Sequence, residues 1–142
     1  MKKISLLVLL VAGLSATSIA QTDQAKMVAT YTSAWGEPDA AKREALLEAS
    51  FSESGEYSDP TAMVEGRDAL VKHIGGFLSQ NPGASFQLLR PAEFHNEKYG
   101  RFEWIMQLPD GTVGLIGMDF VVFDDQGMIQ QITGFFETSV GQ

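Results

Sequence analysis

The segments Tyr57-Ser58-Asp59-Pro60 and Glu65-Gly66-Arg67-Asp68-Ala69 are the most informative part of this chain. The first predicts the end of a short strand over residues 56–58, and the second predicts a helix that begins after a brief loop. Proline fixes its own φ and disfavours the helical region for the residue before it. Asp59 is therefore expected to be extended, with its carboxylate held at the edge of whatever the following helix covers.

The N-terminus predicts a signal peptide over residues 1–20 and a domain over residues 21–142. A basic start, a short apolar run and a small-x-small cleavage site are found in Lys2 and Lys3, residues 4–14, and Ser18-Ile19-Ala20. The apolar run is too short to span a membrane. We expect a secreted or periplasmic protein that is not in the membrane once the signal is removed.

Composition limits the function further. The chain has 142 residues and a net charge of −8, and loss of the two signal lysines makes it more acidic. Such a charge disfavours nucleic acid, so no nucleic-acid partner is expected. The sequence holds no Cys and two His, which excludes disulfides and thiolate chemistry and gives no metal-ligand spacing. We expect neither a metal nor another cofactor.

The hydrophobic pattern predicts an α+β domain with three N-terminal helices. Apolar spacing indicates helices near residues 28–35, 38–51 and 69–80, and a loop over residues 52–55. After Gly83 the pattern is that of strands, listed here in order: residues 85–89, 99–108, 112–123 and 128–137. Helices followed by an antiparallel meander favour a sheet that is covered by helices on one face.

Several segments resemble the nuclear transport factor 2-like superfamily, in its SnoaL-like branch, over about residues 25–138. They are the two segments quoted above, Arg101 to Gly111, Met118 to Phe123, and Gly134-Phe135-Phe136. The resemblance implies a cone-shaped domain, in which three helices pack on a curved, mainly antiparallel sheet that encloses a pocket. It implies frequent dimers, and activities that range from isomerases and cyclases to binders without catalysis.

Ketosteroid isomerases within this superfamily imply a catalytic site at Asp59, Asp119 and Tyr31. On that resemblance, an ionised Asp59 takes a proton, while a protonated Asp119 and the Tyr31 hydroxyl donate to a developing oxyanion. Apolar neighbours such as Met118 and Phe120 are expected to raise the pKa of Asp119 by burial. The alternative is structural: Asp59 anchors a loop, Asp119 accepts a hydrogen bond from the fold, and Tyr31 is a core aromatic residue.

A small hydrophobic molecule is the expected partner. Its binding residues are predicted to be Trp35, Tyr57, Met63, His73, Phe77, Trp104 and Met106. The same side chains would also make an ordinary apolar core. A homodimer is expected as well, because residues 112–123 are apolar on both faces and helices can cover only one of them.

A second resemblance is to limonene epoxide hydrolases. Arg101 and Glu103 match the Arg-x-acid pair of that family, on the strand before the turn at residues 108–111. The second acid of that family would fall near Gly134, and a glycine cannot act as an acid. The simpler interpretation is that Arg101 and Glu103 form an exposed ion pair. Two functions compete, and the sequence pattern favours neither: the first is proton transfer on a small hydrophobic carbonyl compound without a cofactor, as in an isomerase or a cyclase. The alternative is a module that binds a small ligand or dimerises without catalysis.

Overall fold

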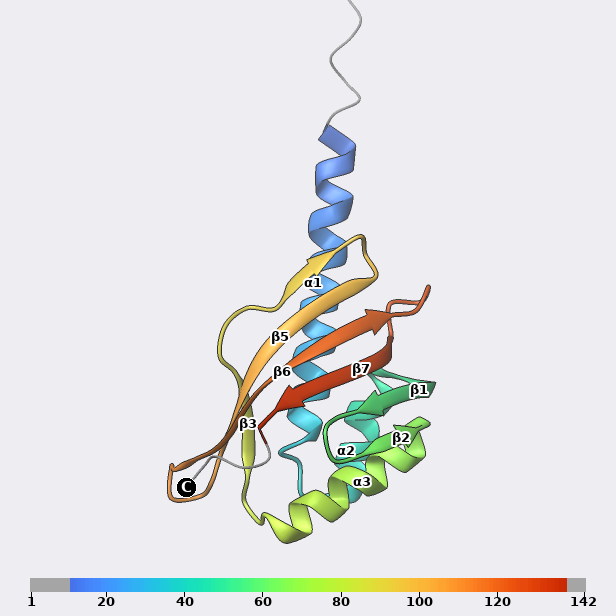
Figure 1. Ribbon diagram of the computed structural model, residues 1–142. Coiled ribbons are helices and arrows are strands. Elements are labelled where there is room, and N and C mark those ends of the chain that lie inside the picture. The colour runs from blue at the N-terminus through green and yellow to red at the C-terminus, as the bar shows by residue number, and fades with distance from the viewer. Residues whose placement is uncertain (1–10, 138–142) are drawn as a thin grey trace, which may run out of the picture.

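The structure is a computed structural model that describes residues 11–137, without the side chains of residues 11–20 and 22. Its helices are α1 (Val11–Ala34), α2 (Ala40–Glu48) and α3 (Arg67–Gln80). Its strands, in chain order, are β1 (Phe51–Ser58), β2 (Met63–Glu65), β3 (Ser85–Leu88), β4 (Glu93–His95), β5 (Tyr99–Gln107), β6 (Val113–Phe123) and β7 (Ile129–Phe136). Figure 1 shows the strands as one curved sheet, with α1 behind it and α3 below it at the bottom of the picture.

The basic start of the predicted signal peptide lies outside the described residues, and its cleavage site lies where no side chains are described. Signal removal before Gln21 therefore stays a prediction. Within the described part of the chain, no helix is both long enough and apolar enough to cross a membrane.

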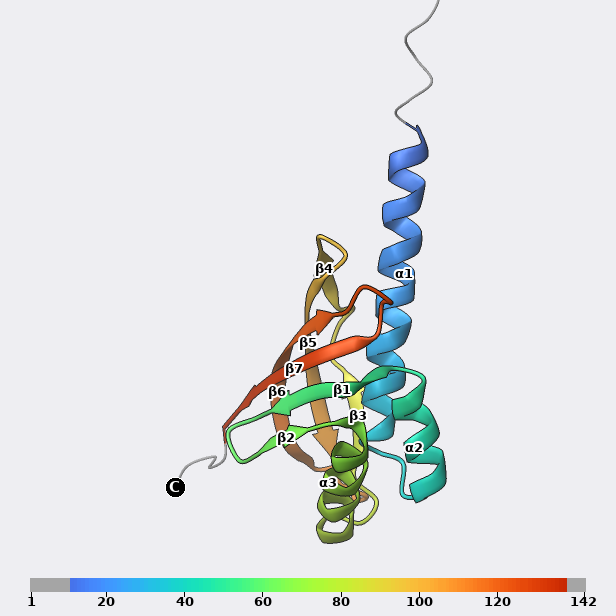
Figure 2. The same ribbon diagram turned by 90° about the vertical axis from the view of Figure 1, so that its right-hand side faces the viewer.

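The sheet is mixed but mostly antiparallel. Its strand order is β2-β1-β7-β6-β5-β3, and β4 also pairs with β5. Strand β1 runs parallel to β7, while the other pairings are antiparallel. Figure 2 shows α1 and α2 on one side of the curved sheet. The predicted α+β class, with helices on one face of a mainly antiparallel sheet, is confirmed.

The helices begin and bury residues as their sequence predicts. The Asp39 side chain caps α2 by accepting a hydrogen bond from the Lys42 backbone N–H at 2.9 Å. The stripe of α1 that the spacing predicted is buried at Val28, Tyr31 and Trp35. These residues form the apolar stripe of the helix and therefore pack on the inner face of the sheet, which leaves the polar side of the helix in water.

The loop predicted over residues 52–55 is wrong, because these residues belong to β1. Phe51, which the sequence placed at the end of the second helix, is the first residue of this strand and pairs with Ile129. A register shift separates Phe51 from Glu56, and the Phe51 ring lies over the space that a side chain at Gly55 would need. The polar run at 52–55 is thus a bulged strand that the parallel pairing with β7 stabilises.

Alternation in β5 and β6 sets the two faces of the sheet. Phe102, Trp104 and Met106 alternate with half-buried residues along β5 and are buried on the inner face. Trp104 lies opposite Gly117 of β6, and a Cβ at that glycine would collide with the indole ring. The absence of a side chain at Gly117 therefore leaves room for the largest residue of the inner face.

We expect Gly117→Ala to lower the free energy of unfolding by about 1–3 kcal/mol, because the added methyl group overpacks against Trp104. Gly76 in α3 has no atom within 4 Å of an added Cβ. Gly76→Ala is the matched control, and it should stabilise the protein by up to about 1 kcal/mol through helix propensity. Urea unfolding of both variants tests the pair. Equal effects of the two substitutions would contradict the packing argument.

Candidate functional site

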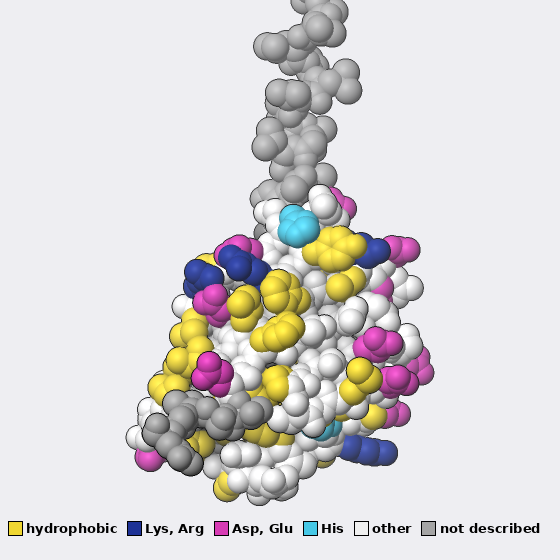
Figure 3. Space-filling view, in the orientation of Figure 1, with side chains coloured by type: hydrophobic (Ala, Val, Ile, Leu, Met, Phe, Trp, Pro, Cys, Tyr) yellow, Lys and Arg dark blue, Asp and Glu magenta, His cyan; other side chains and the backbone are white. Residues whose placement is uncertain are grey.

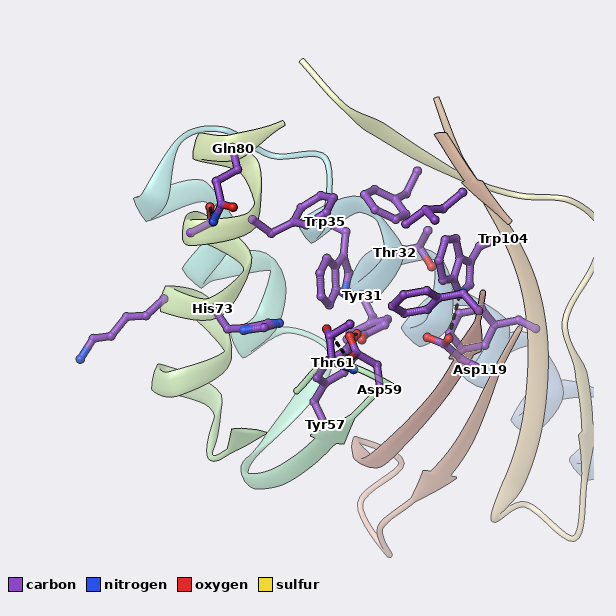
Figure 4. Close-up of a pocket in the computed structure, with 17 residues that line it drawn as sticks. Tyr31, Thr32, Trp35, Tyr57, Asp59, Thr61, His73, Gln80, Trp104 and Asp119 are labelled. Atoms are coloured by element: carbon purple, nitrogen blue, oxygen red, sulfur yellow. Dashed lines mark hydrogen bonds between the residues drawn. The ribbon is translucent and has the colours of Figure 1, made fainter. Parts of the chain in front are cut away.

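A cavity of about 530 Å³ lies between the inner face of the sheet, α1 and α3. This volume suits a small molecule. The sequence-predicted site residues that line it are Tyr31, Trp35, Tyr57, Asp59, His73, Phe77, Trp104 and Asp119. Figure 4 shows these side chains converging on it from α1, α3 and the strands. The lining residues that sequence reasoning missed include Thr61, Phe86, Phe102 and Phe136.

Two of the predicted ligand-binding residues do not line this cavity. Met63 lies on the edge strand β2 with 77% of its surface exposed, because alternation turns Val64 inward instead. Met106 is buried with its methyl group beside Gly114, and it is not one of the residues that line the cavity. Both expectations were wrong because apolar character alone does not tell which residues face a cavity.

Asp59 is held by four hydrogen bonds at the end of β1. Its Oδ1 accepts from the Thr61 N–H at 2.7 Å, the Thr61 hydroxyl at 2.8 Å and the Ala62 N–H at 2.8 Å, and its Oδ2 accepts from the Tyr57 hydroxyl at 2.6 Å. Desolvation raises the pKa of Asp59, but these donors outweigh it and leave that pKa below its usual value. Asp59 is therefore a fixed anion, and the Asp-Pro-Thr sequence is the signal that could have predicted this turn.

Asp119 lies in the opposite electrostatic situation. It is 5% exposed, and its Oδ1 accepts one hydrogen bond, from the Trp104 indole N–H at 2.7 Å. Burial raises its pKa to about 7, although the Trp104 hydrogen bond lowers it, and the negative charge of Asp59 adds a smaller increase. The predicted direction is confirmed, which leaves Asp119 as an acid that titrates near neutral pH.

The residues that desolvate Asp119 differ from those expected. Phe120 is 47% exposed on the outer face, because neighbours in a strand alternate between faces. Asp119 instead pairs with Phe102 of β5 and Gly134 of β7 on its two flanks. The inner face of three strands thus provides the apolar surroundings.

Gly134 brings the two acids together. A Cβ at this position would lie 2.9 Å from Asp119 Oδ1 and 3.6 Å from the Cβ of Asp59. Any larger residue would separate the two side chains. No local pattern in the sequence indicates this role, because it depends on the register of β7 with β6 on one side and with β1 on the other.

Tyr31 is 1% exposed, and its hydroxyl has no hydrogen-bond partner among the described residues. Burial, followed by the negative charge of Asp119, raises its pKa well above the usual value, so the hydroxyl keeps its proton. A buried hydroxyl without a partner is costly. Since Tyr31 lines the cavity, a bound molecule can provide the missing partner.

Aromatic rings form most of the remaining wall. Trp35 is central: its ring centroid lies 5.2 Å from Tyr57, 5.8 Å from Phe86 and 5.9 Å from Phe77. His73 meets the Trp35 ring edge-on at 6.0 Å, from α3. The wall is therefore rigid and apolar, with polar groups gathered near Asp59 and Asp119 (Figure 4).

The epoxide hydrolase template does not describe this site. Arg101 bonds Glu93, and Glu103 bonds Arg90, so both side chains lie on the outer face of β5. The ion pair expected between Arg101 and Glu103 is therefore also wrong. In the described part of the chain, no three His, Cys, Asp or Glu side chains are grouped to hold a metal ion.

No family model matches the sequence, and no curated protein matches it. Solved structures do match. A SnoaL-like family protein from Agrobacterium tumefaciens is 29% identical with a TM-score of 0.76, over 82% of this chain and 98% of that one. A SnoaL-like protein from a Jannaschia species is 11% identical with a TM-score of 0.66, over 82% and 86%. A nuclear transport factor 2-like protein from an Exiguobacterium species is 14% identical with a TM-score of 0.63, over 80% and 99%.

These likenesses agree with the geometry described above, in which helices and a curved sheet enclose a ligand-sized cavity. The chain belongs to the nuclear transport factor 2-like, SnoaL-like superfamily. The resemblance noted in the sequence is thereby confirmed at the level of the superfamily.

We expect Asp119 to make the protein less stable as pH rises from about 4 to 7. Its pKa is about 7 in the folded protein but about 3.9 in an unfolded chain. Between these values the folded state holds one more proton, so stability falls by about 1.4 kcal/mol per pH unit. Asp119→Asn cannot titrate and should remove this decline. Unfolding free energies at pH 4.5, 6 and 7.5 measure the difference, and parallel curves for the two proteins would contradict the raised pKa.

Proposed function

We propose that this protein catalyses proton transfer on a small, mainly apolar carbonyl compound without a cofactor. Asp119 is the group that takes up and returns the proton. The supporting observation is its placement: a buried carboxyl with one hydrogen bond, a pKa of about 7 and access to the cavity. A general acid or base is most effective when its pKa lies near the working pH.

In this proposal Asp59 is not the base that the resemblance implied. All four of its hydrogen bonds stabilise the anion, which makes it a weak proton acceptor. Its fixed charge lies beside Asp119 across Gly134 and disfavours a second charge there. Asp59 thus favours the protonated form of Asp119 and also keeps the loop after β1 in place.

The Tyr31 hydroxyl, the remaining polar group of the site, can stabilise the charge that proton removal creates. When Asp119 removes a proton from the carbon beside a carbonyl group, negative charge develops on the carbonyl oxygen. The Tyr31 hydroxyl is protonated, buried and unpartnered, so it is available to donate to that oxygen. Two of the similar structures are named for isomerase and polyketide cyclase activities, which is consistent with an enzyme.

The base is tested with 5-nitrobenzisoxazole, a flat aromatic probe whose ring opens when one C–H proton is removed. The proton leaves carbon, the N–O bond breaks, and a coloured phenolate forms. We expect the rate to rise with pH to a plateau above about 7, as Asp119 ionises. Asp119→Asn should lower kcat/KM by about 10²–10⁴-fold.

Asp59→Asn should retain more activity than Asp119→Asn and should shift the midpoint of the pH profile downward, since the neighbouring charge is lost. Asp110→Asn, at an exposed turn outside the cavity, is the matched control and should behave as the native protein. A larger loss in Asp59→Asn would return the role of base to Asp59. Native activity in all three variants would show that neither acid is the base and would contradict the proposal, and no activity in the native protein would favour a module that binds a ligand without catalysis.

We also propose that the protein acts after export and as a homodimer. Export is supported by the signal-like N-terminus. Dimerisation is supported by apolar side chains on the outer face of the sheet, where Ile116, Phe120 and Phe135 are 57%, 47% and 55% exposed. Figure 3 shows hydrophobic side chains gathered on this face. Burial of such a patch against its own copy would remove it from water.

Light scattering at micromolar concentration should give about twice the mass of one chain. Phe120→Lys places a charge in the centre of the patch and should give monomers. Met63→Lys changes a residue that is even more exposed, on the edge strand β2 outside the patch, and should leave the dimer intact. A monomeric native protein, or dissociation by both variants, would contradict this interface.

A further inference from the structure

We propose that the ligand of this cavity carries a positive charge, as a protonated or quaternary amine. This inference deepens the proposed function and rests on it only for the location of the site. Three properties of the cavity lead to it: the charge of its acids, the hydrogen-bonding groups that are left unused, and the chemistry of its wall.

The acids of the cavity have no cationic partner. Among the described residues the ion pairs are Arg90–Glu103 and Arg101–Glu93, and both lie on the outer face of the sheet. Asp59 is instead stabilised by neutral donors, and Asp119 by a neutral indole N–H. A fixed negative charge therefore faces a largely apolar cavity, where its field is weakly screened.

Asp119, one of the two acids of the cavity, keeps one carboxyl oxygen free to accept a hydrogen bond. The donors near the acids, which are the Tyr57 hydroxyl, the Thr61 N–H and hydroxyl and the Trp104 N–H, already bond a carboxylate. Asp119 Oδ2 receives no hydrogen bond from the described residues. A protonated amine would complement this oxygen through its N–H and the carboxylates through its charge, and a quaternary amine would complement the charge alone.

The aromatic rings of the cavity wall provide a further kind of contact with a cation. The faces of aromatic rings attract cations within about 6 Å of the ring centroid. Tyr57, Trp35, Phe86 and Trp104 form a continuous series in this order, with neighbouring centroids 5.2, 5.8 and 5.5 Å apart. An ammonium group near Asp59 can therefore contact π-faces while the carboxylates balance its charge.

A cation bound here must be linked to the titration of Asp119. Positive charge favours the ionised form of the acid, so the affinity for a permanent cation should rise as pH passes about 7. The other titratable or charged groups that face the cavity are Asp59, Tyr31, Tyr57, His73 and Lys72. Asp59 and the two tyrosines keep one charge state between pH 6 and 8. Lys72 is exposed, and His73 needs its own control.

Choline and 3,3-dimethyl-1-butanol are the probes, since they have the same shape and differ only in a quaternary nitrogen or carbon. Binding is measured by chemical-shift titration of the native protein at pH 6 and pH 8, at constant ionic strength. We expect choline to bind up to about tenfold more tightly at pH 8, as the ionised fraction of a group with a pKa near 7 rises between these values. The alcohol should bind more weakly than choline at pH 8, without this gain.

Two variants identify the source of the pH dependence. Asp119→Asn should abolish the gain in choline affinity, whereas His73→Gln should keep it, and the backbone spectrum of each variant reports whether the fold is intact. Loss of the gain in His73→Gln alone would assign the effect to the histidine and overturn the linkage to Asp119. Equal binding of choline and the alcohol, or binding of neither, would overturn the inference of a cationic ligand. The reaction with 5-nitrobenzisoxazole does not depend on ligand charge, so it judges the proposed proton transfer separately.

Discussion

The hydrogen bond between the Trp104 indole and Asp119 is the interaction on which the cavity depends. This hydrogen bond is 2.7 Å long, is buried, and joins the adjacent strands β5 and β6 on the inner face of the sheet. Both partners need glycines beside them: Trp104 lies over Gly117, and Asp119 lies against Gly134. The two glycines have no side chain, and this leaves room for a large ring and an acid on the concave face of the sheet.

The two acids of the cavity have opposite properties because their donors differ, not because one is more acidic in isolation. Asp59 sits in a turn whose backbone N–H groups converge on it, and the rigid Pro60 fixes that turn. Asp119 sits in the middle of a strand, where the backbone N–H groups bond neighbouring strands and only a side chain can approach it. Turn and strand geometry therefore separate the pKa values of two identical carboxyl groups.

What the sequence could predict follows the range of the interactions. The helices, the long strands and the Asp-Pro turn arise from neighbours in the chain, and they were predictable from periodicity and turn chemistry. Strand β1 was predicted too short because residues 52–55 are polar and depend on a parallel partner far along the chain. Met63 was assigned to the cavity for the same reason, since the side of a three-residue strand is fixed by its pairing with β1. The role of Gly134 depends on three strands at once and left no local signal.

Stability alone does not account for the residue at position 119. A carboxyl group that is almost fully buried with one hydrogen bond makes the folded state less stable at neutral pH than an uncharged residue of similar shape would. Asparagine could accept the same Trp104 hydrogen bond without that cost. The neighbouring features add to the cost, because a second acid lies across Gly134 and an unpartnered hydroxyl lies at Tyr31. Unfavourable groups that gather at one cavity are the pattern expected of a site that keeps reactive or ligand-binding groups at the expense of stability.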